Sequence, residues 1–219
     1  MTSLTLIIGN KNYSSWSLRP WLVLRNAGIP FEEIRIPLYT PESVVELLKW
    51  SPSGKVPALH DGESQVWDSL AICEYLADRF PDKHLWPDDS TARANARSIS
   101  AEMHAGFNSL REHMSMNIRA RHPNQGRTAG SLADIARITE IWTDCRTRFS
   151  GGGAFLFGRF GIADAMYAPV VLRFLTYGVE LTGVARDYAN SVLALPALQE
   201  WVTAATTEIE RIDTLELYE

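Results

Sequence analysis

The chain has 219 residues, of which 46% are hydrophobic and 21% are charged, which is typical of a soluble globular protein and excludes a disordered or fibrous chain. Its 21 basic and 26 acidic side chains give a formal net charge of −5 with no basic half, so no nucleic-acid partner is expected. The chain has no apolar run near the roughly 20 residues of a bilayer span, and its two cysteines form no CxxC pair, so we expect no membrane partner and a cytoplasmic location.

Residues 4–80 alternate between strand-like and helix-like segments. The apolar periodicity predicts strands over 4–8, 31–36, 56–59 and 65–67, and helices over 17–27, 41–49 and 69–80. The pair Asp61-Gly62 between the last two strands is typical of a hairpin turn. The order β-α-β-α-β-β-α, with its right-handed βαβ unit, predicts a small α/β domain.

After Pro81 the strand pattern stops. A polar linker is predicted over 81–90, followed by helices over 91–122, 131–149, 162–177, 184–193 and 196–212. The helix over 162–177 is strongly apolar and is expected to be central. We therefore predict an α/β domain over 1–80, the linker 81–90, and an all-α bundle over 91–219.

The segment between the first strand and the first helix could carry chemistry. Ser14 and Ser15 lie there, beside free backbone N–H groups and the positive end of a helix dipole. Such a site can hold an anion, including a thiolate, although these serines could also do no more than cap the helix. The absence of a glycine-rich phosphate loop argues against a nucleotide.

A second candidate is the proline that enters the third strand. If the Val56–Pro57 bond is cis, the Val56 backbone turns outward and can pair with an extended peptide. An ordinary trans proline at the start of a strand is the alternative.

A third candidate is Asp68-Ser69, directly before the third helix. Ser69 can act simply as a helix cap. Alternatively, the helix start binds a carboxylate while Asp68 binds an ammonium group, and the α-amino acid end of a ligand would satisfy both.

Together these features resemble the cytosolic glutathione S-transferases over nearly the whole chain. The stretches SPSGKVPAL (51–59) and DSLAICEYL (68–76) are specific motifs of that family. The resemblance implies a thioredoxin-like N-terminal domain, a cis Val56–Pro57 bond, glutathione as cosubstrate and no metal. It also implies a homodimer in which one subunit's α/β domain faces the other's helical domain, with surplus aromatics such as Trp50, Trp86 and Phe80 near the interface.

The stretch from Tyr13 to Arg19 resembles the zeta class, which isomerises maleylacetoacetate and carries two serines, a cysteine and a downstream arginine. Here Trp16 stands at the cysteine position, which disfavours isomerase chemistry. The resemblance therefore implies a glutathione transferase that activates the thiolate for attack on a small electrophile. A zeta-like glutathione-dependent cis–trans isomerase and a non-catalytic partner-binding protein of the same fold remain alternatives.

The resemblance also implies residue roles. Ser14 is the first candidate to donate a hydrogen bond to the glutathione sulfur, Ser15 is the second, and Tyr13 is a rival because other members use a tyrosine. The predicted glutathione-binding residues are Lys55, Val56, Pro57, Asp68 and Ser69. The predicted electrophile pocket comprises Trp16, Met103, His104, Phe107, Arg111, Arg173 and Tyr177.

Some of these residues also have plain structural interpretations. Arg173 lies on a very apolar helix and needs a partner, either a protein carboxylate or an anionic substrate. The segment 155–164 resembles the family's helix-capping motif, with Gly161 where Ser or Thr is usual, so Asp164 is expected to be structural. Cys73 and Cys145 lie on apolar helical faces and are expected to be inert.

Overall fold

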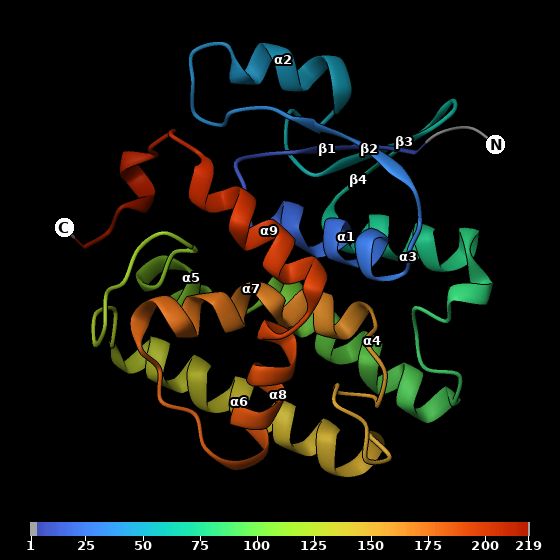
Figure 1. Cartoon of the computed structure of the whole chain (residues 1–219), viewed down its shortest axis with the longest axis vertical. Coiled ribbons are helices and arrows are strands. Elements are labelled where there is room, and N and C mark those ends of the chain that lie inside the picture. The colour runs from blue at the N-terminus through green and yellow to red at the C-terminus, as the bar shows by residue number, and fades with distance from the viewer. Residues whose placement is uncertain (1–3, 219) are drawn as a thin grey trace.

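The computed structural model describes residues 4–218 and consists of a sheet with helices on both faces, followed by a helical bundle (Figure 1). The first part contains β1 (Leu4–Ile8), α1 (Ser15–Asn26), β2 (Phe31–Arg35), α2 (Ser43–Trp50), β3 (Ala58–Asp61), β4 (Ser64–Trp67) and α3 (Ser69–Arg79). The second contains η1 (Pro81–Lys83), α4 (Ser90–Ala105), α5 (Asn108–His113), α6 (Ala129–Phe149), α7 (Ile162–Tyr177), α8 (Gly183–Leu193), α9 (Pro196–Thr207) and η2 (Asp213–Leu215). The predicted fold class, a thioredoxin-like α/β domain followed by helices, is confirmed.

The strand order in the sheet is β2-β1-β3-β4, with β1 parallel to β2 and the other pairs antiparallel. Because side chains alternate along a strand, Leu6 and Ile8 of β1 enter the large core on the side of α1 and α3. Ile7 points the other way, into a smaller cluster with Leu47 of α2. Figure 1 shows α2 on one face of the sheet and α1 and α3 on the other.

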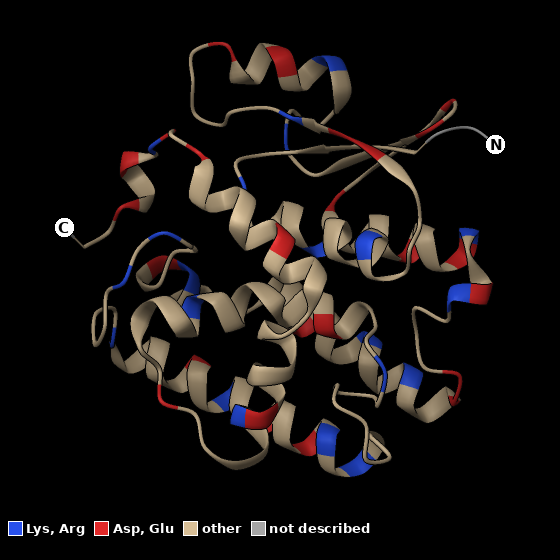
Figure 2. Ribbon diagram, viewed as in Figure 1, with Lys and Arg blue, Asp and Glu red and all other residues tan. Residues whose placement is uncertain are grey.

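Helix α7 is the central helix of the bundle, as its apolar sequence predicts. All of its residues except Leu175 are buried, and its ribbon carries almost no charged segment in Figure 2, whereas both signs of charge are interspersed on α4 and α6. Asp164 in its first turn is 1% exposed, and its carboxylate accepts hydrogen bonds from the backbone N–H of Gly161 (2.9 Å) and of Leu156 (3.1 Å). Asp164 therefore holds the helix start to the preceding loop, as expected.

The prediction of one helix over 91–122 is wrong. Helix α4 ends at Ala105, because Gly106 is extended and Phe107 adopts a left-handed conformation with φ of 59°. After the short α5, the chain is irregular up to α6, and its backbone bonds to other segments: the Ile118 N–H donates to the Asn12 carbonyl at 3.3 Å. This irregular segment therefore braces the loop that follows β1.

Several further boundaries differ from the predictions: β3 runs over Ala58–Asp61 rather than 56–59, and α2 begins at Ser43 rather than at residue 41. Helix α1 begins at Ser15 rather than at residue 17, because Ser14 is its N-cap and accepts a hydrogen bond from the Ser17 N–H. Helix α9 ends at Thr207 rather than at 212, because Glu208 is extended and its side chain bonds to the loop after β1. In the described part of the chain, no helix has the length and apolar character needed to cross a membrane.

Candidate active site

A cavity of about 740 Å³ lies where the start of α1 meets the segment before β3 and the helical bundle. The predicted site residues on its wall are Ser14, Ser15, Trp16, Lys55, Val56, Arg111 and Arg173. Tyr13, the rival to Ser14, also lies on the wall. The wall residues without a predicted role are Leu38, Tyr39, Thr40, Pro41, Ser43, Val44, Leu47, Gly54, Ser115, Met116 and Leu215. The fold thus brings the serine motif, the Val56–Pro57 motif and two arginines to one cavity.

Ser14 is the N-cap of α1, and its side chain is buried, with 6% of the residue exposed. Its hydroxyl donates to the Ser17 Oγ at 2.8 Å, and Ser17 Oγ in turn accepts from the Gly9 N–H at 3.1 Å. This chain of hydrogen bonds fixes Ser14 at the positive end of the helix dipole, where a nearby anion is stabilised. Ser14 is therefore a helix cap that also faces the cavity.

Ser15 is the first residue of α1, and its Oγ accepts a hydrogen bond from Arg173 Nη2 at 3.4 Å. Tyr13, directly before Ser14, directs its hydroxyl away from both serines. The Tyr13 hydroxyl donates to the Glu216 carboxylate and accepts from Arg119 Nη2 at 2.9 Å. Its proton is thus already engaged in a bond within the chain.

Two arginines contact the Trp16 ring, and a third, Arg173, contacts the neighbouring Ser15. The guanidinium carbon of Arg19 lies 4.2 Å from the centre of the Trp16 ring, and that of Arg111 lies 4.7 Å from it. Such contacts are cation–π interactions, which strengthen when the groups are desolvated. Arg173 donates to the Met114 carbonyl and to Ser15.

These arginines have no carboxylate at ion-pair distance in the part of the chain that the structure describes, although Asp68 and Asp134 attract Arg19 and Arg111, respectively, from farther away. Within residues 4–218, no carboxylate forms an ion pair with Arg19, Arg111 or Arg173, and Arg19 has two nitrogens without a hydrogen-bond partner. Burial, together with the neighbouring positive charges, lowers the pKa of both Arg19 and Arg173 to about 9. All three remain cationic at neutral pH, so the region around Trp16 attracts anions.

Arg19 is a site residue that the sequence analysis did not assign. It is fully buried, and its Nη1 donates to the Ser69 hydroxyl at 3.4 Å, which links α1 to the start of α3. A usable signal was present, because Arg19 stands between Leu18 and Pro20 in an apolar stretch. Like Arg173, Arg19 is a cation in an apolar stretch and needs a partner when it is buried.

The predicted glutathione-binding residues lie in two parts of the structure, the segment before β3 and the start of α3. Lys55 is exposed and Val56 is half-buried on the cavity wall, and the Val56–Pro57 bond is cis with Pro57 buried behind it. Asp68 and Ser69 lie at the start of α3, outside the cavity wall. One Asp68 oxygen caps the helix by accepting from the Leu70 N–H at 2.9 Å.

The residues predicted for the electrophile pocket do not all lie on the cavity wall. Trp16, Arg111 and Arg173 line the cavity, whereas Met103, Phe107 and Tyr177 are buried in the core. Met103 and His104 do not share a helix with Phe107 and Arg111, because α4 ends at Ala105.

His104 also lies outside the cavity wall, edge-on to Trp16 with ring centres 5.2 Å apart. Its Nε2 is 3.2 Å from an Asp68 carboxylate oxygen. Burial lowers the pKa of His104, and Asp68 opposes that effect. His104 therefore contacts Trp16 and Asp68 but does not line the cavity.

The remaining groups of interest do not form a second catalytic centre. Cys73 and Cys145 are buried, and burial raises the pKa of both thiols, so they remain protonated as expected of inert core cysteines. No three His, Cys, Asp or Glu side chains within residues 4–218 gather where they could hold a metal ion.

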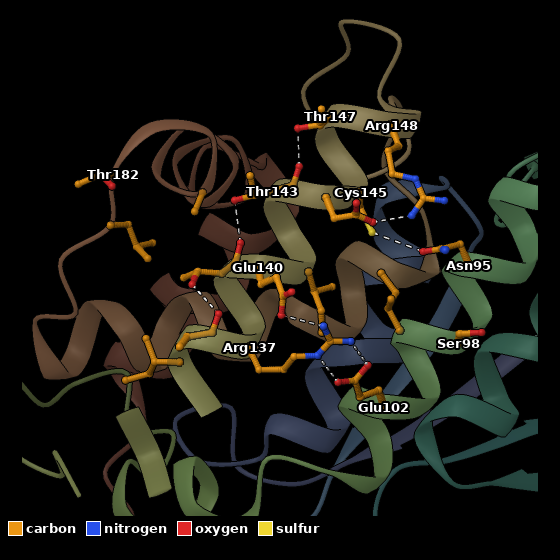
Figure 3. A pocket seen from close by; sticks show the side chains of 18 of the residues that line it. Asn95, Ser98, Glu102, Arg137, Glu140, Thr143, Cys145, Thr147, Arg148 and Thr182 are labelled. Carbon is orange, nitrogen blue, oxygen red and sulfur yellow. Dashed lines mark hydrogen bonds and ion pairs between the residues drawn. The ribbon is translucent and has the colours of Figure 1, made fainter. Parts of the chain in front are cut away.

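A larger hollow of about 1050 Å³ lies over α4 and α6 (Figure 3). Most of its charged side chains are already paired: Arg137 contacts Glu102 at 2.8 Å and Glu140 at 2.9 Å, and Arg148 contacts Asp144 at 2.7 Å. Paired surface charges bind an added ligand weakly, because they must first give up their partners. The larger hollow is therefore not the better candidate for the active site. The cavity at Ser14 is favoured because Arg111 and Arg173 on its wall form no ion pair within the described part of the chain.

Comparison with known proteins identifies the family to which the chain is similar. The profile "Glutathione S-transferase, N-terminal domain" matches residues 13–79, and "Glutathione S-transferase, C-terminal domain" matches residues 101–204. The chain is 24% identical over 204 residues to glutathione S-transferase GstB of Escherichia coli (strain K12), covering 92% of this chain and 93% of that protein. It is 35% identical over 96 residues to a probable maleylacetoacetate isomerase of Caenorhabditis elegans, a match that spans 44% of each protein.

Among solved structures, a glutathione transferase homolog from Burkholderia GL BGR1, crystallised with bound glutathione, shares the fold. Its TM-score is 0.71 at 22% sequence identity, over 94% of this chain and 100% of that one. The two matched family profiles together span more than half of the chain, and they agree with the motifs and the architecture. The chain belongs to the glutathione S-transferase family.

Proposed function

We propose that this glutathione S-transferase activates its cosubstrate with the Ser14 hydroxyl. The observation that carries the proposal is that Ser14 shares one cavity with Val56 and Lys55 and stands at the start of α1. A hydroxyl that donates to the glutathione sulfur stabilises its thiolate, and the α1 dipole and the nearby cations act in the same direction. The thiolate then attacks a small electrophile held in the same cavity.

Ser14 is favoured over Tyr13 by the acceptor that each hydroxyl proton already has. The Tyr13 proton is donated to the Glu216 carboxylate, whereas Ser15 only accepts a bond, from Arg173, and keeps its own proton. The Ser14 proton is donated only to another hydroxyl, that of Ser17, so a charged acceptor would compete for it favourably. Ser15 remains the second candidate.

The rest of glutathione would be held as the family resemblance implies. The Val56 backbone pairs with the cysteinyl part, with Pro57 behind it, and Lys55 contacts a peptide carbonyl or carboxylate. Asp68 and Ser69 take the γ-glutamyl end at the start of α3.

Retention on immobilised glutathione, followed by the ultraviolet absorbance of the bound thiolate, tests this proposal. We expect the chain to be retained, to elute with free glutathione, and to show thiolate absorbance near neutral pH. Absence of retention would refute glutathione binding. Retention without a lowered thiol pKa would instead favour a non-catalytic, partner-binding member of the family.

We further propose that the electrophile carries a negative charge. Arg111 and Arg173 reach the cavity wall without a carboxylate of the described residues at ion-pair distance, and Arg111 and Arg19 both contact the Trp16 ring. A buried cation without a counter-charge is costly, and a bound carboxylate would relieve that cost while orienting the substrate.

Replacing Arg173 by methionine is expected to weaken binding of an anionic electrophile selectively. Loss of a charge-assisted hydrogen bond, worth about 1.5–3 kcal/mol, corresponds to a rise in KM of about tenfold to a hundredfold. The measurement compares a chlorodinitrobenzoate with uncharged chlorodinitrobenzene, which carries the same reactive group. Equal losses for both compounds would contradict an anion-binding role for Arg173.

Glutathione-dependent cis–trans isomerisation is the second candidate activity. The partial match to a probable maleylacetoacetate isomerase and the arginines around Trp16 support it, whereas Trp16 at the cysteine position argues against it. Conversion of maleylacetoacetate by the purified chain, with and without glutathione, distinguishes isomerisation from conjugation.

We also propose a cytoplasmic homodimer. The predicted aromatics support it only weakly, because Trp86 is buried and donates to Glu74 within the same chain. Stronger support comes from β4, an edge strand whose Trp67 is 47% exposed, because exposed strand edges are usually covered.

The expected sedimentation mass is twice the 24.5 kDa of one chain at micromolar concentration. Replacing Trp67 by lysine should shift the equilibrium toward the monomer, because the interface would have to bury a charge. A wild-type mass near that of a single chain would contradict the dimer.

A further inference from the structure

The loop between β1 and α1, which carries Ser14, is held by the segment that follows α9. We call residues 208–218 the anchoring segment. The two carboxylate oxygens of Glu208 accept hydrogen bonds from consecutive backbone N–H groups, Lys11 at 2.7 Å and Asn12 at 3.0 Å. The Glu208 side chain is 7% exposed, so these bonds are shielded from water.

Glu216 provides a second attachment, directly beside Ser14. One of its oxygens accepts from the Tyr13 hydroxyl, and the other accepts from Asn117 Nδ2 at 2.6 Å. Arg119 completes the connection, because its Nη2 donates to the Tyr13 hydroxyl at 2.9 Å and to the Glu210 carbonyl at 2.7 Å. The anchoring segment thus contacts the three residues that precede Ser14 in the chain.

These bonds satisfy backbone groups that have no regular partner. The Lys11 and Asn12 N–H groups lie between β1 and α1, so neither the sheet nor the helix accepts their hydrogen bonds. A buried N–H without a partner costs about 1–3 kcal/mol, so the loop would move to find another acceptor if Glu208 could not bond to both. Such a movement would carry Ser14 with it.

Activation of the thiol depends on the precise position of the Ser14 hydroxyl. A hydrogen bond weakens steeply when its angle falls below about 120°, so a small rotation of the loop is enough to weaken the bond to the sulfur. Catalytic groups need to be held within about 0.5 Å of their productive position by surrounding residues.

We propose that Glu208 and Glu216 are positioning residues for thiol activation, acting through Ser14. The inference rests on the proposed role of Ser14. Both glutamates are distant from Ser14 in the sequence: the Lys11–Glu208 bond joins residues 197 positions apart, and the Tyr13–Glu216 bond joins residues 203 positions apart.

The test uses Glu208→Gln and Glu216→Gln, with Glu210→Gln as the matched control. The Glu210 side chain belongs to the same segment but pairs with Arg35 at 2.8 Å and does not contact the loop. In Glu208→Gln the amide has only one acceptor oxygen for two N–H donors. We expect the first two variants to raise the pKa of the bound glutathione thiol and to lower kcat about threefold to tenfold, with KM for glutathione within twofold of wild type. The control should change neither.

A double-mutant cycle separates positioning from a general loss of stability. If Glu208 acts through Ser14, the variant Ser14→Ala/Glu208→Gln should have the same thiol pKa and kcat as Ser14→Ala alone. Additive losses would overturn the inference, as would wild-type thiol pKa and kcat in both glutamate variants. Thermal melting shows whether each variant is folded. If Glu208→Gln does not fold, the same measurements on Glu216→Gln decide the proposal.

Failure of the inference can be distinguished from failure of the proposed function. If Ser14→Ala shifts the thiol pKa and the glutamate variants do not, only the positioning roles are wrong. If Ser14→Ala itself has no effect, the assignment of Ser14 fails and the positioning proposal fails with it.

Discussion

Replacing Ser14 by alanine is expected to raise the pKa of the bound glutathione thiol by about one to two units. A hydrogen bond to a charged group is worth about 1.5–3 kcal/mol, and each pKa unit corresponds to 1.36 kcal/mol. The rate at neutral pH should therefore fall about tenfold to a hundredfold. Glutathione should still bind, because Val56, Asp68 and Ser69 remain in place.

The measurement is the thiolate absorbance of the glutathione complex, titrated against pH for wild type, Ser14→Ala, Ser15→Ala and Tyr13→Phe. Ser14 also caps α1, and losing a cap costs about 1 kcal/mol of stability, so each variant is melted as well. If Ser14→Ala titrates like wild type while Ser15→Ala shifts, the catalytic role belongs to Ser15.

Replacing Asp164 by alanine is expected to lower the free energy of unfolding by about 2–5 kcal/mol. The substitution leaves the Gly161 and Leu156 N–H groups buried without an acceptor, and each such group costs about 1–3 kcal/mol. Chemical denaturation measures the loss. The matched control is Asp89→Ala, which removes the exposed cap of α4 and should cost about 1 kcal/mol. Similar losses in the two variants would contradict the special role of Asp164.

The same residue predicts a pH dependence of stability. Burial raises the pKa of Asp164 to about 7 in the folded chain, from 3.8 for an unperturbed aspartate. Between those values the folded state holds the proton more tightly than the unfolded state does, so this contribution to stability falls as pH rises from about 4 to 7. Asp164→Asn cannot ionise, and its denaturation midpoint should lack this component of the pH dependence. An unchanged slope in Asp164→Asn would contradict the prediction.

Local sequence patterns were sufficient to predict most of the elements. The apolar periodicity of 162–177 placed α7 at both of its ends, and Asp61-Gly62 located the β3–β4 turn. These features depend on neighbouring residues, so they can be recognised without knowing the rest of the fold. The family motifs also located the candidate glutathione site, at the Ser14, Val56–Pro57 and Asp68-Ser69 stretches.

The failures occurred where a tertiary contact overrides a local preference. The helical pattern continues past Ala105, yet the chain turns at Phe107, and the irregular segment beyond α5 pairs with Asn12 and Thr176 instead. Likewise the pattern continues past Thr207, but the Glu208 carboxylate bonds to the loop after β1. Neither partner lies nearby in the sequence, so no local pattern reports it.

The sequence by itself thus determined the order of the elements, the two-part architecture, the family and the motif around Ser14, because each depends on residue types at short spacing. Only the tertiary structure decided which residues share the cavity. It buries Met103, Phe107 and Tyr177 in the core, and it brings both Arg19 and Arg111 against the Trp16 ring. The physical reason is that burial and charge pairing are properties of the assembled chain: an arginine in the sequence has no counter-charge or neighbour until distant helices pack around it.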